Sequence, residues 1–351
     1  MLILLHRWLG VLAGSVLILL SVSGFLLLWM DEYIDWRYPA LPDEADFISP
    51  DARLIEGILL AANPRVSSLG MPTITRPYYH AYLEGGRQQI YHPTTGELLA
   101  NWTWVDSVPL FFFELHARLL LGEVGHLAVG VTGIACSISI ISGLLIWWRR
   151  RRIFRVRFLL PSGVNWVQLL KSHVAQGVVI SMLFLVLSVT GIAMVFPDPF
   201  RDALNFGFGV NGPLRPQAWE LEAYSGEIQW PHILASAERA LPNAALRFVT
   251  PPRNDASPIM LRLRMPAELH PNGRSYLAVV PGSGEILEIV SAPELGLGPI
   301  ILDAFYPVHS GKTNWFGHKF VLSLVSFSLL YLAVSGLAIF VQRSEFGRKP
   351  V

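Results

Sequence analysis

The sequence has one cysteine and few charged residues. Cys136 lies in an apolar run, so neither a disulfide framework nor a cysteine-based metal site can form within one chain. The residues Asp, Glu, Lys and Arg make up 15% of the chain, against about 25% in soluble domains. With a single cysteine there is also no CxxCH motif for covalent haem attachment. These absences favour a membrane protein and leave the ten histidines as the main candidates for chemistry.

Four long runs contain no Asp, Glu, Lys, Arg or His. Each has 22 or 23 residues, which as a helix spans about 33 Å and crosses a hydrocarbon core of about 30 Å. The first run ends without a small-residue cleavage site, so we expect a retained helix and no signal peptide. The predicted spans are Trp8–Met30, Leu127–Trp148, Val174–Phe196 and Phe320–Val341.

Basic residues flank these runs on one side. If there are four spans, all of these residues face the same compartment, which the positive-inside rule identifies as the cytoplasm. We therefore expect a multi-pass protein of the bacterial inner membrane with both termini cytoplasmic and both long connecting segments periplasmic. The basic residues are Arg7, Arg149, Arg150, Arg151, Arg152, Arg155, Arg157, Lys171, Arg343, Arg348 and Lys349.

The two long connecting segments have similar patterns. Each has a helical stretch that ends before a proline, then alternating strand-like runs and a Gly-Glu hairpin turn. This order predicts a small α+β domain in each segment. In the first segment the elements are 49–62, 79–83, 87–91 and the turn 92–97; in the second they are 231–240, 246–250, 259–264, 275–280, the turn 281–285 and 286–290.

The membrane runs repeat as well. Each has a histidine near its start and, 17 or 18 residues later, a glycine preceded by serine or threonine. Four occurrences in four spans favour a tandem duplication. The pairs are His6 with Ser23-Gly24, His126 with Ser142-Gly143, His173 with Thr190-Gly191, and His318 with Ser335-Gly336.

Alternating helix directions sort these histidines into two layers. His6 and His173 fall toward the cytoplasm, and His126 and His318 toward the outside. Two non-covalent b-type haems, each with two histidine ligands, fit this pattern, and the small pairs would leave room for the macrocycles. In the competing interpretation, the glycines mediate helix packing and the histidines are interfacial. Zinc is less favoured, because no HxxxH or ExxH spacing occurs within a span.

A second symmetric pair offers another outer site. His116 lies ten residues before His126, and His309 lies nine before His318. Both belong to short segments that we expect to be amphipathic elements at the outer membrane surface. Three interpretations are open for His116 and His309. They are alternative ligands of the outer haem, they line the site where substrate meets haem, or they are surface histidines of an interfacial helix. The remaining candidates are expected to be solvated domain residues: His80, His92, His232 and His270.

The predicted fold class is therefore a four-helix membrane bundle from a tandem duplication, with two small α+β periplasmic domains. The expected boundaries are 1–30 for helix 1, 31–106 for domain 1, 107–148 for an interfacial helix and helix 2, 149–164 for a basic cytoplasmic loop, 165–196 for helix 3, 197–300 for domain 2, 301–342 for an interfacial segment and helix 4, and 343–351 for a cytoplasmic tail.

Several motifs resemble a known family. The segment Tyr91-His92-Pro93-Thr94-Thr95-Gly96-Glu97 resembles the turn signature of PepSY domains. The segments 5–10, 115–125 and 309–311 resemble the PepSY-associated transmembrane family. The resemblance implies PepSY-like outer domains and a relation to haem-containing ferrisiderophore reductases of the FoxB type. It also implies that the characteristic outer histidines are His116 and His309.

The sequence thus predicts a haem-dependent oxidoreductase that reduces ferric iron in a siderophore or similar chelate at the outer face. No catalytic side chain is assigned. Hydrolysis is disfavoured because no nucleophile–base pair recurs. Expected partners are the ferric chelate, a quinol or separate cytoplasmic reductase as donor, and a periplasmic siderophore-binding protein; nothing indicates nucleic acid. The alternatives are a haem-free PepSY regulator or binding protein, and a quinol-linked b-type cytochrome with another acceptor.

Overall fold

The structure, a computed structural model, describes residues 1–38, 50–62, 64–149, 155–313 and 315–346. The chain divides into two compact units, a membrane unit and a sheet unit. Five of the predicted flanking basic residues lie outside the described part: Arg150, Arg151, Arg152, Arg348 and Lys349. The membrane unit comprises Met1–Trp29, Phe111–Pro199 and Val308–Val351, and the sheet unit comprises Met30–Leu110 and Phe200–Pro307.

The membrane unit contains four long apolar helices among the described residues. Their most apolar windows have mean hydropathies of 2.1–2.6, yet only 22–28% of each window is buried. An apolar helix with most of its surface exposed requires lipid around it, and a helix satisfies its own backbone groups there. The chain is therefore a multi-pass membrane protein. The helices are α1 (Leu2–Leu28), α5 (Gly122–Arg149), α6 (Trp166–Val195) and α10 (Gly317–Phe346).

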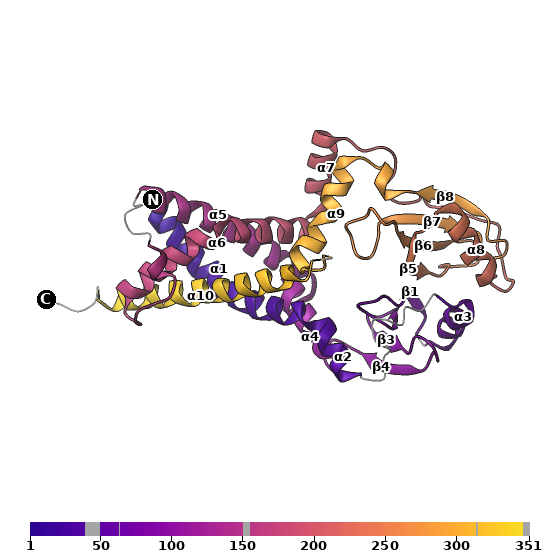
Figure 1. The fold of residues 1–351 in the computed structure, drawn as a ribbon, viewed down its shortest axis with the longest axis horizontal. Coiled ribbons are helices and arrows are strands. Elements are labelled where there is room, and N and C mark those ends of the chain that lie inside the picture. The colour runs from indigo at the N-terminus through magenta and orange to yellow at the C-terminus, as the bar shows by residue number, and fades with distance from the viewer. Residues whose placement is uncertain (39–49, 63, 150–154, 314, 347–351) are drawn as a thin grey trace. The chain divides into compact units, whose positions relative to one another are not determined.

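The main helix contacts define a ring. Helices α1 and α6 each pack against both α5 and α10, so α1 and α6 occupy opposite corners. Helix α10 runs antiparallel to α1, because the rings of Trp8 and Phe340 lie 5.5 Å apart while Trp29 Nε1 donates to Ser323 Oγ at 3.1 Å. We call the end at Trp8 the terminal end, since α1 begins and α10 ends there (Figure 1). The end at Trp29 is the connecting end.

The sheet unit is built on one antiparallel sheet with the strand order β4-β3-β2-β1-β5-β6-β7-β8. The first four strands in sequence belong to the first half of the chain and the last four to the second. Strands β1 and β5 join the halves through the pairs Leu69–Val249 and Gly70–Phe248. The strands are β1 (Val66–Gly70), β2 (Tyr79–Leu83), β3 (Gln88–Tyr91), β4 (Leu98–Trp102), β5 (Ala245–Thr250), β6 (Ile259–Arg264), β7 (Ser275–Val279) and β8 (Ile286–Val290).

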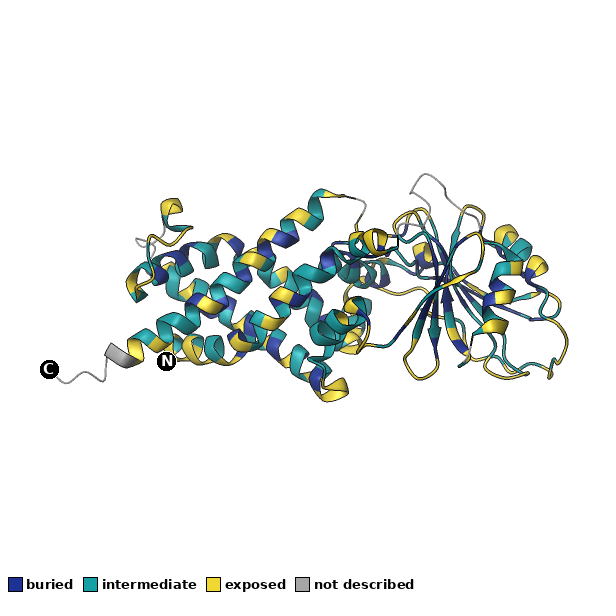
Figure 2. Ribbon diagram, turned by 90° about the horizontal axis from the view of Figure 1, so that it is seen from below, coloured by how far each residue is buried: buried dark blue, intermediate teal, exposed yellow. Residues whose placement is uncertain are grey.

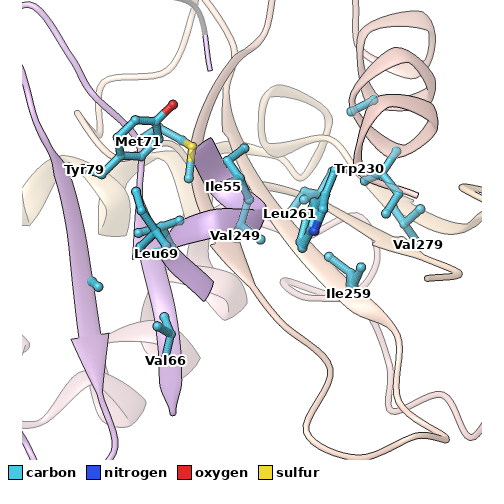
Figure 3. Packing of buried hydrophobic residues seen from close by; sticks show 14 of the residues in the cluster. Ile55, Val66, Leu69, Met71, Tyr79, Trp230, Val249, Ile259, Leu261 and Val279 are labelled. Carbon is cyan, nitrogen blue, oxygen red and sulfur yellow. The ribbon is translucent and has the colours of Figure 1, made fainter. Parts of the chain in front are cut away.

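Two amphipathic helices, α3 (Ala52–Ala61) and α8 (Trp230–Ala240), cover one face of this sheet. Their apolar sides bury Ile55 and Trp230, which are 0% and 2% exposed, against strand residues such as Leu69, Val249 and Leu261 (Figure 3). Buried residues consequently concentrate along the strands, whereas the membrane helices carry exposed side chains along their length (Figure 2). One core therefore holds both halves of the sheet together.

The order of elements repeats, as the tandem duplication predicts. The first half runs α1, α2 (Met30–Arg37), α3, β1 to β4, α4 (Val108–Arg118) and α5. The second half runs α6, α7 (Pro197–Phe208), α8, β5 to β8, α9 (Leu297–Ser310) and α10. Among the described residues, two single 3-10 turns, η2 (Val156–Phe158) and η3 (Ala292–Glu294), interrupt this correspondence.

His6 and His173 lie within helices α1 and α6. The structure differs from the sequence predictions at strand β1 and at His270. Strand β1 was not predicted, because its residues Val-Ser-Ser-Leu-Gly include two serines and a glycine and show no strand signal. The prediction that His270 is solvated is wrong: it is 4% exposed and stacks on Tyr306 with ring centroids 4.9 Å apart.

Candidate functional site

Four of the six candidate histidines meet in two pairs. The ring centroids of His6 on α1 and His173 on α6 lie 6.4 Å apart near the terminal end of the bundle. Those of His116 on α4 and His309 on α9 lie 6.2 Å apart near the connecting end. We call these the terminal pair and the connecting pair. Each pair takes one histidine from each half of the chain, as the duplication requires.

Tight chain reversals position the connecting pair. After α4 the backbone turns through Leu119 and Leu120, which have φ values of 50° and 60°, before α5 begins at Gly122. A Cβ at Gly125 would lie 1.6 Å from the Arg118 carbonyl oxygen, so only glycine fits there. Non-glycine residues at positive φ are strained and cluster at functional sites. The second half reverses after α9 at Gly311, where φ is 71°.

Each of the four rings is anchored through Nδ1 to a neighbouring membrane helix. The anchor is always the hydroxyl of the Ser-Gly or Thr-Gly pair that the sequence singled out, and in three cases also a backbone carbonyl. The contacts are His6 with Ser142 Oγ (3.2 Å) and Ser139 O (3.0 Å), His116 with Ser23 Oγ (3.1 Å) and Leu20 O (3.1 Å), His309 with Thr190 Oγ1 (3.0 Å) and Leu187 O (3.1 Å), and His173 with Ser335 Oγ (3.0 Å).

These anchors fix the tautomer of each imidazole. All four hydroxyls donate their single hydrogen to a carbonyl of their own helix: Ser23 to Leu19, Ser142 to Ser139, Thr190 to Val186 and Ser335 to Leu332. A hydroxyl has only one hydrogen, so each must accept from the histidine. Nδ1 therefore carries the proton, and the lone pair of every ring is at Nε2.

The glycine of each pair lies against the imidazole itself. A Cβ at Gly24 would lie 2.9 Å from His116 Cε1, and one at Gly143 would lie 3.0 Å from His6 Cε1. The equivalent distances are 3.1 Å from Gly191 to His309 and 3.4 Å from Gly336 to His173. The dipeptide thus forms a cradle, with the hydroxyl on Nδ1 and the glycine beside the ring edge. The sequence indicated the depth of these pairs, but not this role.

The other two candidates, His126 and His318, do not form a pair within the described residues. His126 Nδ1 lies 3.2 Å from the Ala117 carbonyl oxygen, and His318 Nδ1 lies 3.1 Å from Thr313 Oγ1. Both partners are close in sequence, at the turns that start α5 and α10. Such local contacts stabilise the turns that precede α5 and α10.

The residues fit a haem with two axial histidines. Two imidazoles bound to one metal at bond lengths of about 2 Å have ring centres about 6 Å apart, close to the 6.4 and 6.2 Å found here. Ligating histidines generally donate their other ring N–H to a protein oxygen, as all four do. The described residues contain no group of three His, Cys, Asp or Glu that could hold a bare metal ion. Two protein ligands with four macrocycle nitrogens would complete the coordination.

The fold and these pairs define a class: a duplicated four-span membrane protein with matched histidine pairs near both ends of its bundle. The sequence matches the family described as the PepSY-associated TM region over residues 3–343, and the chain belongs to that family. No curated protein matches the sequence.

Proposed function

We propose that this PepSY-associated membrane protein binds two b-type haems and passes electrons across the membrane to reduce ferric iron in a siderophore or similar chelate. The observation that supports it best is the two equivalent histidine pairs, whose ring centroids lie 6.4 and 6.2 Å apart and whose lone pairs are at Nε2. His6 and His173 of the terminal pair would hold one haem, and His116 and His309 of the connecting pair would hold the other. The motif resemblance to FoxB-type ferrisiderophore reductases agrees with this assignment.

The chain's own residues prepare these sites for a redox cofactor. When bound, each haem supplies a one-electron carrier. The Nδ1–H bonds orient the rings and raise the basicity of Nε2. On α1, His6 of the terminal pair lies 18 residues before Gly24 in the cradle of the connecting pair. This spacing separates the two sites by about 27 Å along the helix. This separation is close to the thickness of a hydrocarbon core.

The direction of transfer follows from the orientation we expect. Arg7, Arg149 and Arg343 lie at the terminal end, which the positive-inside rule assigns to the cytoplasm. The connecting pair then faces the periplasm, where the chelate is reduced. Reduction lowers the charge of iron and makes it softer, so hard oxygen ligands hold it less tightly.

Haem counting on single His→Ala variants tests the proposal. We expect about two haems per wild-type chain, and about one in each variant of His6, His173, His116 and His309. His126→Ala and His318→Ala are matched controls, because each removes a histidine of the same unit that has only a local contact. Both controls should keep two haems. Well-folded protein without haem would end the proposal and favour the haem-free regulator.

Turnover tests the substrate. The chemically reduced protein should be reoxidised by a ferric chelate with stoichiometric appearance of Fe(II), and His116→Ala should lose this reaction. Reoxidation by oxygen or another acceptor but by no ferric chelate would leave a b-type cytochrome and contradict the reductase assignment.

A further inference from the structure

A pocket opens on the sheet face opposite α3 and α8, at the seam between the two halves of the sheet. Strands β1, β2 and β5 contribute to its walls. Its empty space, including the opening to solvent, is about 280 Å³. The lining residues are Gly70, Met71, Thr73, Arg76, Tyr78, His80, Tyr82, Arg247, Phe248 and Asn272.

Arg247 is the residue in this pocket whose charge is least compensated. Its Nε is buried without a hydrogen-bond partner, and within the described part of the chain its guanidinium makes no ion pair. A buried, unpartnered donor on a charged group is costly. Such a group is normally paired, so an acceptor supplied by a ligand would stabilise it.

The neighbours of Arg247 repel its charge. Burial, and then the positive charges of Arg264 and Arg76, lower the pKa of Arg247 to about 10. Asp31 acts electrostatically on Arg76, whereas the charges that act on Arg247 are those of Arg264 and Arg76. The pocket therefore gathers positive charge that an anion would neutralise.

Two carboxylates of the sheet unit have partners of their own. Glu268 accepts from Met265 N at 2.9 Å and from Ser275 Oγ at 2.6 Å. Asp303 pairs with Arg274 at 3.1 Å. Within the described residues, neither forms an ion pair with Arg247.

The remaining walls of the pocket are largely aromatic. Tyr78 is 3% exposed, and Arg262 lies over the ring of Phe248 at 5.6 Å. Apolar walls strengthen a charge-assisted hydrogen bond because they exclude water. Asn272 accepts from Arg76 through Oδ1 at 2.9 Å, which leaves its amide N–H groups as further donors.

We propose that this seam pocket binds an oxyanionic arm, a carboxylate or catecholate, of the ferric chelate, with the guanidinium of Arg247 as the principal partner. The pocket is too small for a whole chelate. The choice of ligand rests on the proposed function, whereas the anion site itself does not. The protein would accordingly prefer anionic over cationic ferric chelates.

Binding to the oxidised, full-length protein in detergent tests this without any reduction. The probes are ferric citrate, iron-free citrate and a cationic ferric hydroxamate, each titrated by calorimetry. Ferric citrate should bind most tightly, and Arg247→Gln should weaken it about tenfold or more, since a hydrogen bond to a charged group is lost. Arg247→Lys should retain part of the affinity.

Arg53→Gln is the matched control, because Arg53 lies on α3 at the opposite sheet face with a side chain 91% exposed. It removes the same charge and should leave binding unchanged. Equal affinities in wild type, Arg247→Gln and Arg53→Gln would overturn the site. Equal affinity for iron-free citrate would overturn the chelate as ligand. Loss of binding in Arg247→Gln together with haem-free protein would keep the anion site and reject the reductase.

Discussion

One added carbon atom in a histidine cradle should displace the imidazole, and Gly24 is the clearest position to test this. A Cβ there would lie 2.9 Å from His116 Cε1, closer than such atoms approach, so Gly24→Ala must displace the ring. We expect this variant to lose about one of its two haems. Gly10→Ala on the same helix is the control, since a Cβ there meets nothing within 4 Å. Equal haem content in both variants would contradict the cradle.

The buried histidine of the sheet unit predicts a pH dependence. Burial, and then Arg274, Arg262 and Arg264, lower the pKa of His270 to about 2, against about 6.5 when unfolded. A depressed pKa gives stability that is present above the unfolded value and is lost as the pH falls. In the wild-type protein, His270 should therefore lower the free energy of unfolding by up to about 1.4 kcal/mol for each pH unit below pH 6.5. The variant His270→Gln should not show this decrease. Urea unfolding of the full chain at several pH values between 7 and 5 measures this slope.

Asp303 should affect the pH dependence of stability in the direction opposite to His270. Burial is the main cause that raises the pKa of Asp303 to about 6. A raised pKa gives stability that is complete below the unfolded value and is lost as the pH rises through the folded one. Asp303→Asn should therefore make the protein more sensitive to acid, while His270→Gln makes it less so. Parallel slopes in the two variants would show that these groups do not control the response.

At the scale of elements, the seam between β1 and β5 makes the two sheet halves one cooperative structure. Leu69 is 0% exposed in the shared core, so Leu69→Ala should cost about 2–5 kcal/mol. Because the core is shared, hydrogen exchange should speed up in β6 of the second half as well as in β2. Leu60→Ala on α3, where the side chain is 79% exposed, is the control. Faster exchange in the first half alone would show that the halves unfold separately.

Strand β1 at this seam could not be predicted from the sequence, whereas other elements could. The membrane helices and strands such as β6 could be predicted, because long apolar runs and strict alternation are local signals. Strand β1 could not, since its burial comes from β5, which lies 175 residues or more further along the chain.

At the scale of the whole molecule, the sequence indicated six candidate histidines but not which of them meet. Spacing within spans favoured His126 and His318 as the outer pair, whereas the family motif favoured His116 and His309. The structure brings the second pair together, because the reversals after α4 and α9 return these histidines to α1 and α6. Pairing across a bundle depends on helix order, which no local pattern contains. Ligation itself is tested by the haem counts above.

The electron donor is also a question for the whole molecule. Helix α5 ends at Arg149 and α6 begins at Trp166, so about 16 residues join them at the terminal end. A nicotinamide-binding βαβ unit needs about 30 residues and a glycine fingerprint. Between residues 149 and 171 the sequence has a single glycine, Gly163. This connection is too short to hold a nicotinamide site.

We therefore expect a quinol analogue, but not NADH or NADPH, to reduce the haems of the purified protein. Electrons should enter at the terminal pair, because it lies at the end assigned to the cytoplasm, and then reach the connecting pair. In His6→Ala the quinol analogue should consequently leave the connecting haem oxidised, although dithionite still reduces it. In His116→Ala the terminal haem should still be reduced by the quinol analogue. Visible spectra recorded after each addition give both results. Rapid, saturable reduction by micromolar NADH would reject this route, and quinol reduction of the connecting haem in His6→Ala would reverse the order of transfer.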